Sequence, residues 1–240
     1  MSSAMNKGST MTTYIAETAQ VYDRARVSGQ ARVYGQAMVY GRSWVSDEAQ
    51  VYGQAMVCGE AWVYAEAQVY DRAQVYDRAM VCGQVQVYGQ SQVYGRAMVC
   101  GEAQVYGHAK VYGQAEVYSQ VEVYGQGDIA STRHYLTIGP VGSEDRTVTV
   151  HRHYDGPDSA TWGHLVIAGC WNGRLDELAA RIAVDRTHGW RGDVSRWRSD
   201  YEGIIALARP RVAEWAAEPL TEEDHTRWAE VVEDIEKEDV

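Results

Sequence analysis

The sequence predicts a mainly β protein: a three-sided parallel β-helix of 18 residues per coil, followed by a small α+β domain. Three observations predict this fold. Valine occupies every sixth position from Val21 to Val123, a small residue stands two positions before each valine, and similar residues recur every 18 positions. A short, fixed repeat is the signature of a solenoid, in which each unit buries its apolar side only by stacking on its neighbours.

Each six-residue unit predicts one short strand and one corner. The unit reads A-x-V-Y-G-x, as in residues 49–54, and Ile15 and Ile129 continue its phase. Alternation of small, variable, Val and Tyr residues is the period-two pattern of a strand with one buried side. The glycine that follows permits a positive φ, and its usual replacement is aspartate, which also tolerates that conformation.

The outward residues predict three units per coil. When the residue before each valine is sorted by a period of 18, Trp44, Trp62, Met80 and Met98 fall in one column, whereas a period of 12 mixes the columns. The residue after valine gives an unbroken series of tyrosines at the same period, from Tyr34 to Tyr124. Six to seven coils are expected over residues 14–130, with a height of roughly 30 Å at the spacing of β-strands.

This repeat resembles the left-handed parallel β-helix of the hexapeptide-repeat superfamily. The valine and the alanine match that family's pattern, whereas tyrosine takes the second position and glycine moves to the third. The resemblance implies a left-handed coil. It also implies an alternative function, because many members are trimeric acyl- or acetyltransferases with a catalytic histidine on a loop extruded from a coil. Here the phase is unbroken, and His108 is the only histidine of the repeat.

One outer face predicts an interface. Large apolar residues in consecutive coils form a contiguous patch, which usually marks a protein–protein contact. We expect this face to bind a protein partner, to support self-association such as a homotrimer, or to receive the chain's own C-terminal helices. Its residues are Trp44, Trp62, Met80, Met98, Tyr64, Cys82 and Cys100. The Tyr/Gln columns predict a solvated ladder of mutually supporting side chains, with stacking on a flat ligand or a sugar as the alternative.

Composition restricts the class of protein. The net charge of −11 argues against a general nucleic-acid or anionic-membrane binder. No stretch approaches the ~20 apolar residues of a membrane span. Cys58, Cys82 and Cys100 stand where tyrosine is usual, so we interpret them as packing variants rather than a disulfide framework. These features predict a cytoplasmic protein with reduced thiols.

Four segments are expected along the chain. Residues 1–13 form an N-terminal cap or are disordered, 14–130 the β-helix, 131–218 the α+β domain and 219–240 an acidic amphipathic helix. Strands are expected at 135–138, 147–154 and 164–170, and helices at 174–188 and 197–208, the latter interrupted near Pro210. Thr221 is the expected N-cap of the last helix.

The second domain resembles a short domain of uncharacterised phage and prophage proteins, which often follows hexads of this kind. The strings that carry the resemblance are residues 135–143, 166–178, 188–189 and 200–208. The resemblance implies an architecture and a phage or prophage origin, and it brings no activity with it.

Few residues suggest chemistry. His151 and His153 lie two apart on a predicted strand and could supply two metal ligands, yet no third ligand follows at a defined spacing. Cys170 could be a nucleophile beside a histidine, but a buried small hydrophobic residue is the favoured interpretation. We therefore expect no catalytic residue, no cofactor and no metal. The predicted function is a non-enzymatic scaffold that carries a small interaction domain, and a further alternative is a phage protein that sequesters a host factor or small ligand.

Overall fold

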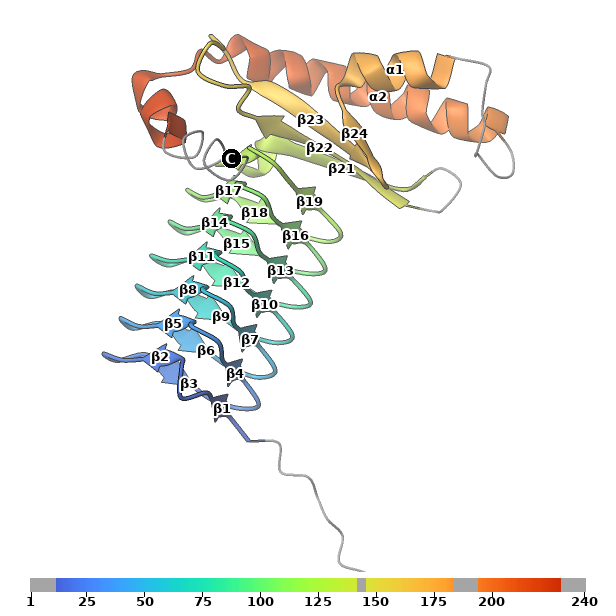
Figure 1. Ribbon diagram of the computed structural model, residues 1–240. Coiled ribbons are helices and arrows are strands. Elements are labelled where there is room, and N and C mark those ends of the chain that lie inside the picture. Colours follow the sequence, from blue (N-terminus) through green and yellow to red (C-terminus); the bar gives the residue numbers. More distant parts are fainter. Residues whose placement is uncertain (1–11, 142–145, 184–193, 230–240) are drawn as a thin grey trace, which may run out of the picture.

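The protein is described from a computed structural model, which covers residues 12–141, 146–183 and 194–229. A solenoid of about six turns rises from the N-terminal side, and a smaller domain lies across its far end (Figure 1). The predicted class is confirmed: the described chain is mainly β, with three parallel sheets followed by an antiparallel sheet and a few helices.

The solenoid is made of two-residue strands, and each strand pairs with the strand three places along the chain. Sheet A contains β1 (Tyr14–Ile15), β4 (Arg32–Val33), β7 (Gln50–Val51), β10 (Gln68–Val69), β13 (Gln86–Val87), β16 (Gln104–Val105) and β19 (Glu122–Val123). Sheet B contains β2 (Gln20–Val21), β5 (Met38–Val39), β8 (Met56–Val57), β11 (Gln74–Val75), β14 (Gln92–Val93), β17 (Lys110–Val111) and β20 (Asp128–Ile129). Sheet C contains β3 (Arg26–Val27), β6 (Trp44–Val45), β9 (Trp62–Val63), β12 (Met80–Val81), β15 (Met98–Val99) and β18 (Glu116–Val117).

Pairing across coils follows the predicted period of 18. Gln68 pairs with Gln86 and Val69 with Val87, in parallel register. The inward-facing valines and alanines from Ala31 to Val123 are fully buried and fill the centre of the coil. Where serine replaces alanine inside, its hydroxyl is satisfied: Ser43 Oγ donates to the carbonyl of Tyr40 at 2.8 Å. The interior is therefore a uniform stack of small apolar side chains.

The corners explain the alternation of glycine and aspartate. Gly53 has a φ of +71°, and a Cβ at this position would lie 2.9 Å from the backbone nitrogen of Asp71 in the next coil. Asp71 itself has a φ of 59°, and its carboxylate accepts the N–H of Gly89, one coil further on, at 3.2 Å. Asp23, Asp47 and Asp77 make the same bond to the next coil. Aspartate thus offsets part of the backbone strain with a bond between coils.

The second domain begins with a short 3-10 helix, η1 (Thr132–His134), and an antiparallel sheet in the order β21-β22-β23-β24. The first three strands are β21 (Tyr135–Val141), β22 (Arg146–His153) and β23 (Gly163–Ala168), which confirms the three predicted strands. The fourth, β24 (Trp171–Gly173), was not predicted from the sequence because three residues show no alternation. Cys170 lies in the turn between β23 and β24 and is exposed, so the prediction that it is buried was wrong.

Helix α2 corrects a second prediction. It runs unbroken from Val194 to Ala217 through Pro210. Proline removes one helical hydrogen bond and normally kinks or ends a helix. On one side of it Ala208 is fully buried in the domain core, and on the other Trp215 is buried and its Nε1 donates to the carbonyl of Arg133 at 3.0 Å. Packing on both sides therefore holds the helix together.

The other helices match the prediction in part. α1 spans Leu175–Ala183, and the remainder of the predicted helix at 184–188 lies outside the described residues. Residues 222–229 are helical. Thr221 caps them as predicted: its Oγ1 accepts the N–H of Asp224, and its own N–H donates to the Asp224 carboxylate. In the described part of the chain, none of the helices combines the length and the apolar character needed to cross a bilayer.

Candidate interaction face and the capped end of the solenoid

The predicted apolar residues share one outer face of the solenoid, over sheet C. We call this the Trp/Met face and define it by Trp44, Trp62, Met80, Met98, Tyr64, Cys82 and Cys100. Strand register stacks Trp44 on Trp62, Trp62 on Met80 and Met80 on Met98. The valine between each outward pair is fully buried, so the strands turn these side chains outward.

The tryptophans form the accessible part of this face. Trp62 is 44% exposed, an unusually large fraction for its residue type. Its ring meets that of Trp44 edge-on at 5.2 Å. Below it, Trp44 Nε1 donates to Ser28 Oγ at 3.1 Å, and the Arg26 guanidinium lies 5.9 Å from the centre of the Trp44 ring. Trp44 is thus held by polar neighbours, and Trp62 presents apolar surface to solvent.

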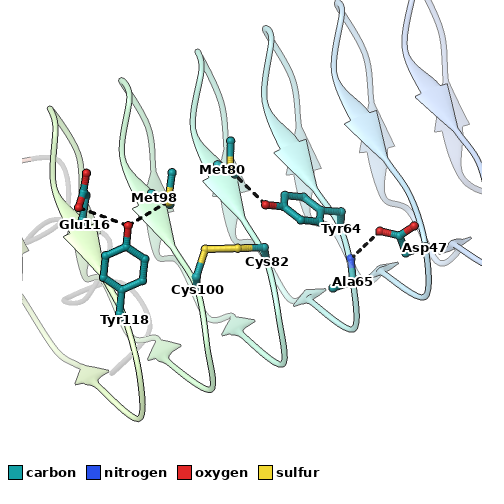
Figure 2. Close-up of a disulfide and its surroundings, with 9 residues drawn as sticks. All are labelled: Asp47, Tyr64, Ala65, Met80, Cys82, Met98, Cys100, Glu116 and Tyr118. Carbon is teal, nitrogen blue, oxygen red and sulfur yellow. Dashed lines mark hydrogen bonds between the residues drawn. A yellow bond between two sulfur atoms is a disulfide. The ribbon is translucent and has the colours of Figure 1, made fainter.

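Two cysteines of the face are joined, which corrects the prediction of reduced thiols. Cys82 and Cys100 form a disulfide between adjacent coils (Figure 2). They are 18 residues apart, so one lies directly above the other, and their Cα atoms are 4.7 Å apart, within the range a disulfide spans. Both cysteines fall in one column of the sequence. Their interpretation as replacements for tyrosine overlooked that adjacent coils are as far apart as the two Cα atoms of a disulfide. Cys58 and Cys170 are free cysteines.

Tyrosine hydroxyls flank the disulfide on both sides. Tyr64 donates to Met80 Sδ at 3.3 Å, and Tyr118 donates to Met98 Sδ at 3.2 Å (Figure 2). Tyr64 reaches up to the next coil, whereas Tyr118 reaches back to the preceding one. Tyr118 also donates to the Glu116 carboxylate. The two phenols therefore enclose the methionines and the disulfide between them.

The Tyr/Gln columns are a ladder of stacked side chains. Rings of Tyr52 and Tyr70 are parallel with centroids 4.9 Å apart, and Tyr52 Oη donates to Gln68 Oε1 in the next coil. Burial in the stack raises the pKa of Tyr70 to about 12, with charge repulsion from neighbouring tyrosines adding to it. These contacts support the predicted ladder, because each ring is already stacked on its neighbours.

Side chains of β22 close the open end of sheet A. Within the solenoid a strand N–H donates to a carbonyl 17 residues later, as Gln104 does to Val121 at 2.8 Å. Among the described residues, β19 is the last strand of sheet A. Instead, the backbone N–H of Glu122 donates to Thr149 Oγ1 at 3.3 Å, and the backbone N–H of Tyr124 donates to His151 Nε2 at 3.4 Å. Both acceptors belong to β22, which therefore takes the place of the missing coil.

One of the two candidate metal-binding histidines, His151, serves this cap. The rings of His151 and His153 are 6.1 Å apart, on one face of β22 as expected. His151 is fully buried, and its Nδ1 donates to the carbonyl of Arg152, so both ring nitrogens are occupied. Burial lowers the pKa of His151 to about 4 and that of His153 to about 3, which keeps both rings neutral. Among the described residues, no group of three His, Cys, Asp or Glu side chains is placed to hold a metal ion.

A buried ion pair joins the two domains, and no pattern in the sequence predicted it. Asp128 of β20 is fully buried and forms a short salt bridge with Arg152 of β22. Its carboxylate also accepts from Tyr112 Oη at 3.0 Å and from Trp228 Nε1 at 3.3 Å. Arg152 and Trp228 lie 24 and 100 residues away from Asp128, so no local spacing could have indicated them. This cluster fixes the domain on the end of the solenoid.

The C-terminal helices occupy other surfaces than the Trp/Met face. α2 packs on β21, β22 and β23. The helix at 222–229 contacts the last coils: Lys110 Nζ donates to the carbonyl of Arg227, and Arg227 reaches Tyr112 Oη at 2.5 Å. Lys110 and Tyr112 belong to β17 and the corner after it, in the Tyr-bearing column of sheet B. The contacts of these described helices therefore give no support to docking on the Trp/Met face.

A cavity of about 630 Å³ lies where the last coils meet the antiparallel sheet. Its lining comprises Gly101, Glu102, Ser119, Gln120, Thr137, Gly139, Pro140 and Thr147. Gln120 bridges two of these residues, donating to Glu102 at 3.0 Å and accepting from Thr147 at 3.2 Å. The lining mixes polar and apolar groups, and the Thr137 hydroxyl in it is buried without a hydrogen-bond partner among the described residues.

Comparison with known proteins finds a family model that is similar to parts of the repeat. The family described as the YdcK beta solenoid repeat matches residues 19–30 and 73–89, both within the three-sheet coil. No curated protein and no solved structure matches the chain. The matched residues and the stacked parallel sheets together make this chain a β-solenoid repeat protein, similar in its coils to the YdcK repeat.

Proposed function

We propose that the protein is a non-enzymatic scaffold whose solenoid binds protein through the Trp/Met face. The observation that carries this proposal is the exposed Trp62, which continues a column of large apolar side chains through four coils. Exposed apolar patches of this kind mark interaction sites. Tryptophan is also enriched among the residues that dominate binding energy.

The regular coil supports a structural role. Strands follow one another every six residues from β1 to β20, so no loop leaves the coil to carry a reactive group. An acyltransferase of the hexapeptide-repeat type remains the alternative enzyme, and His108 would be its candidate base. Calorimetry with acetyl-CoA tests it: saturable binding that His108→Ala abolishes would replace the scaffold proposal by the enzyme.

Self-association is the first form of contact to test. Light scattering on the full chain is compared between the parent protein and Trp62→Glu. Glutamate is compatible with this column, because Glu116 occupies the same position two coils beyond Met80 by strand register. Gln68→Glu is the matched control, since Glu122 occupies that column of sheet A. We expect the parent to be an oligomer, Trp62→Glu a monomer and Gln68→Glu an oligomer.

Two results would count against self-association. An oligomer that survives Trp62→Glu must use another surface. A monomeric parent would leave a different protein as the candidate partner. The resemblance of the second domain to phage and prophage proteins motivates a search for it in an extract of a bacterial host. Capture from a host extract that depends on Trp62, with Gln68→Glu as the control, would then test the scaffold itself.

A further inference from the structure

The sequence A-M-V-C-G occurs three times, at residues 55–59, 79–83 and 97–101. In the second and third copies the methionine and the cysteine are separated by a fully buried valine, so both side chains point outward. These two copies are one coil apart, and Met80 pairs directly with Met98. Four sulfur atoms thus belong to two adjacent strands of sheet C and the corner residues that follow them. The first copy lies in sheet B and has no such neighbour, because Met56 pairs with Met38 and Gln74.

The surroundings hold these sulfurs as a group. Cys82 and Cys100 are already bonded to each other. The usual corner tyrosine reaches the following coil, as Tyr52 does to Gln68, but Tyr118 reaches the preceding one. Tyr64 and Tyr118 consequently approach from opposite sides and donate to the two thioethers (Figure 2). The sulfur group is partly exposed, so an ion can reach it from solvent.

We propose that, after reduction of the disulfide, Cys82, Cys100, Met80 and Met98 bind one Cu(I) ion. A dithiol or phosphine reductant supplies two electrons, and the two sulfurs take up two protons as the S–S bond breaks. Cu(I) then displaces the thiol protons to solvent, because the thiolate is the metal ligand. Each methionine exchanges the hydrogen bond from its tyrosine for the metal by rotation about its flexible side chain.

The ligand set selects the ion. Thiolate and thioether sulfurs are soft ligands and favour Cu(I), whereas zinc sites are built from cysteine, histidine and carboxylates. In the oxidised form Cys82 and Cys100 have no free thiol, so this site should not bind the ion. The site uses side chains of the Trp/Met face, but it does not depend on a protein partner at that face.

The experiment measures competition for Cu(I) between the reduced full chain and bicinchoninate, read as loss of the coloured copper complex without oxygen. The parent carries Cys58→Ser and Cys170→Ser, which remove the two other cysteines. We expect one Cu(I) per chain. Met80→Leu/Met98→Leu should weaken the affinity for Cu(I) by about 10-fold to 100-fold or more, because loss of a residue that merely supports a metal ligand already has an effect of this size. Cys82→Ser/Cys100→Ser should abolish it, and Met56→Leu should change nothing.

Several results would overturn the proposal. These are equal affinity of the parent and the double leucine variant, binding by the oxidised protein, or tighter binding of zinc than of Cu(I). Circular dichroism checks that each variant is folded. If the leucine variant is not, X-ray absorption of the copper-loaded parent decides: sulfur ligation that includes the thioethers supports the site, and two-sulfur ligation rejects it. Neither result depends on the oligomer measurements above, so this proposal and the scaffold proposal fail separately.

Discussion

His151 Nε2 accepts the backbone N–H of Tyr124 at 3.4 Å, in the place where one more coil would have offered a carbonyl oxygen. A neutral imidazole with its proton on Nδ1 is the form that can do this, since a protonated ring has no acceptor. The end of the solenoid therefore depends on the charge state of one buried side chain.

Acidification should weaken the protein through this histidine. Its pKa is lowered from 6.5 to about 4 by burial, so between those values the unfolded chain takes up a proton that the folded chain refuses. The stabilisation is complete above about pH 6.5 and is lost as the pH falls toward 4, by about 3 kcal/mol in all. Urea unfolding at pH 7 and pH 5 measures it. His151→Gln should reduce the difference between the two pH values, and an unchanged difference would assign it to other histidines.

Breaking the buried ion pair should destabilise the junction strongly. Arg152→Met leaves the fully buried Asp128 carboxylate without its main cation, and loss of one partner of a buried pair typically costs about 3–5 kcal/mol. The matched control is Arg78→Met, which removes an exposed pair with Glu60 and should cost about 0–1 kcal/mol. Thermal unfolding by circular dichroism compares them. Equal losses would mean that the other partners of Asp128, which are Tyr112, Trp228 and Arg227, hold it without Arg152.

The effect of a corner substitution on stability should depend on the φ of the residue and on its hydrogen bond to the next coil. Gly53→Ala places a Cβ on a residue with a positive φ, which should destabilise the fold by about 1–2 kcal/mol. The same Cβ would also lie 2.9 Å from the backbone of Asp71. Gly53→Asp should cost less, because aspartate can accept the N–H of the next coil as Asp47 and Asp77 do. The reverse change, Ala65→Gly, should stabilise, since Ala65 already has a φ of 59°. Denaturant midpoints rank the three, and alanine tolerated better than aspartate would contradict the account.

Pro210→Ala should stabilise the second domain. The helix continues through this residue, so alanine restores a backbone donor and removes a clash that together cost up to about 3 kcal/mol. The gain should appear as a higher midpoint of urea unfolding. Arg209→Ala, one residue earlier on an exposed position, is the control. A loss of stability with Pro210→Ala would show that proline shapes α2 rather than straining it.

The solenoid could be predicted because its information is local. Each strand repeats the residues of the strand 18 positions away, so a column of the sequence is also a column in space. The disulfide was not predicted, although both cysteines fall in one column. They stand where the other hexads have tyrosine, so they were interpreted as replacements for tyrosine. Strand β24 was missed because it is too short to show a pattern.

The junction could not be predicted, since its contacts join distant parts of the chain. Asp128 occupies an ordinary outward position of the repeat, where Lys110 and Gln92 precede it in the column. Its burial follows only from the docking of Arg152 and Trp228. Continuity of α2 likewise depends on Trp215 and the backbone of Arg133, which the helix's own sequence does not reveal.

In the described part of the chain, β22 bonds to the last coil of sheet A, while the coils below repeat the same register. The length of the solenoid can therefore change by whole coils without changing the orientation of the second domain about its axis. Removing residues 68–85, one full coil, would lower the second domain by a single strand spacing and keep it above the same face. Removing a single hexad would instead turn that domain by about a third of a revolution relative to Trp62. The number of complete coils thus sets the height of the second domain, and any additional hexads set the direction in which it faces.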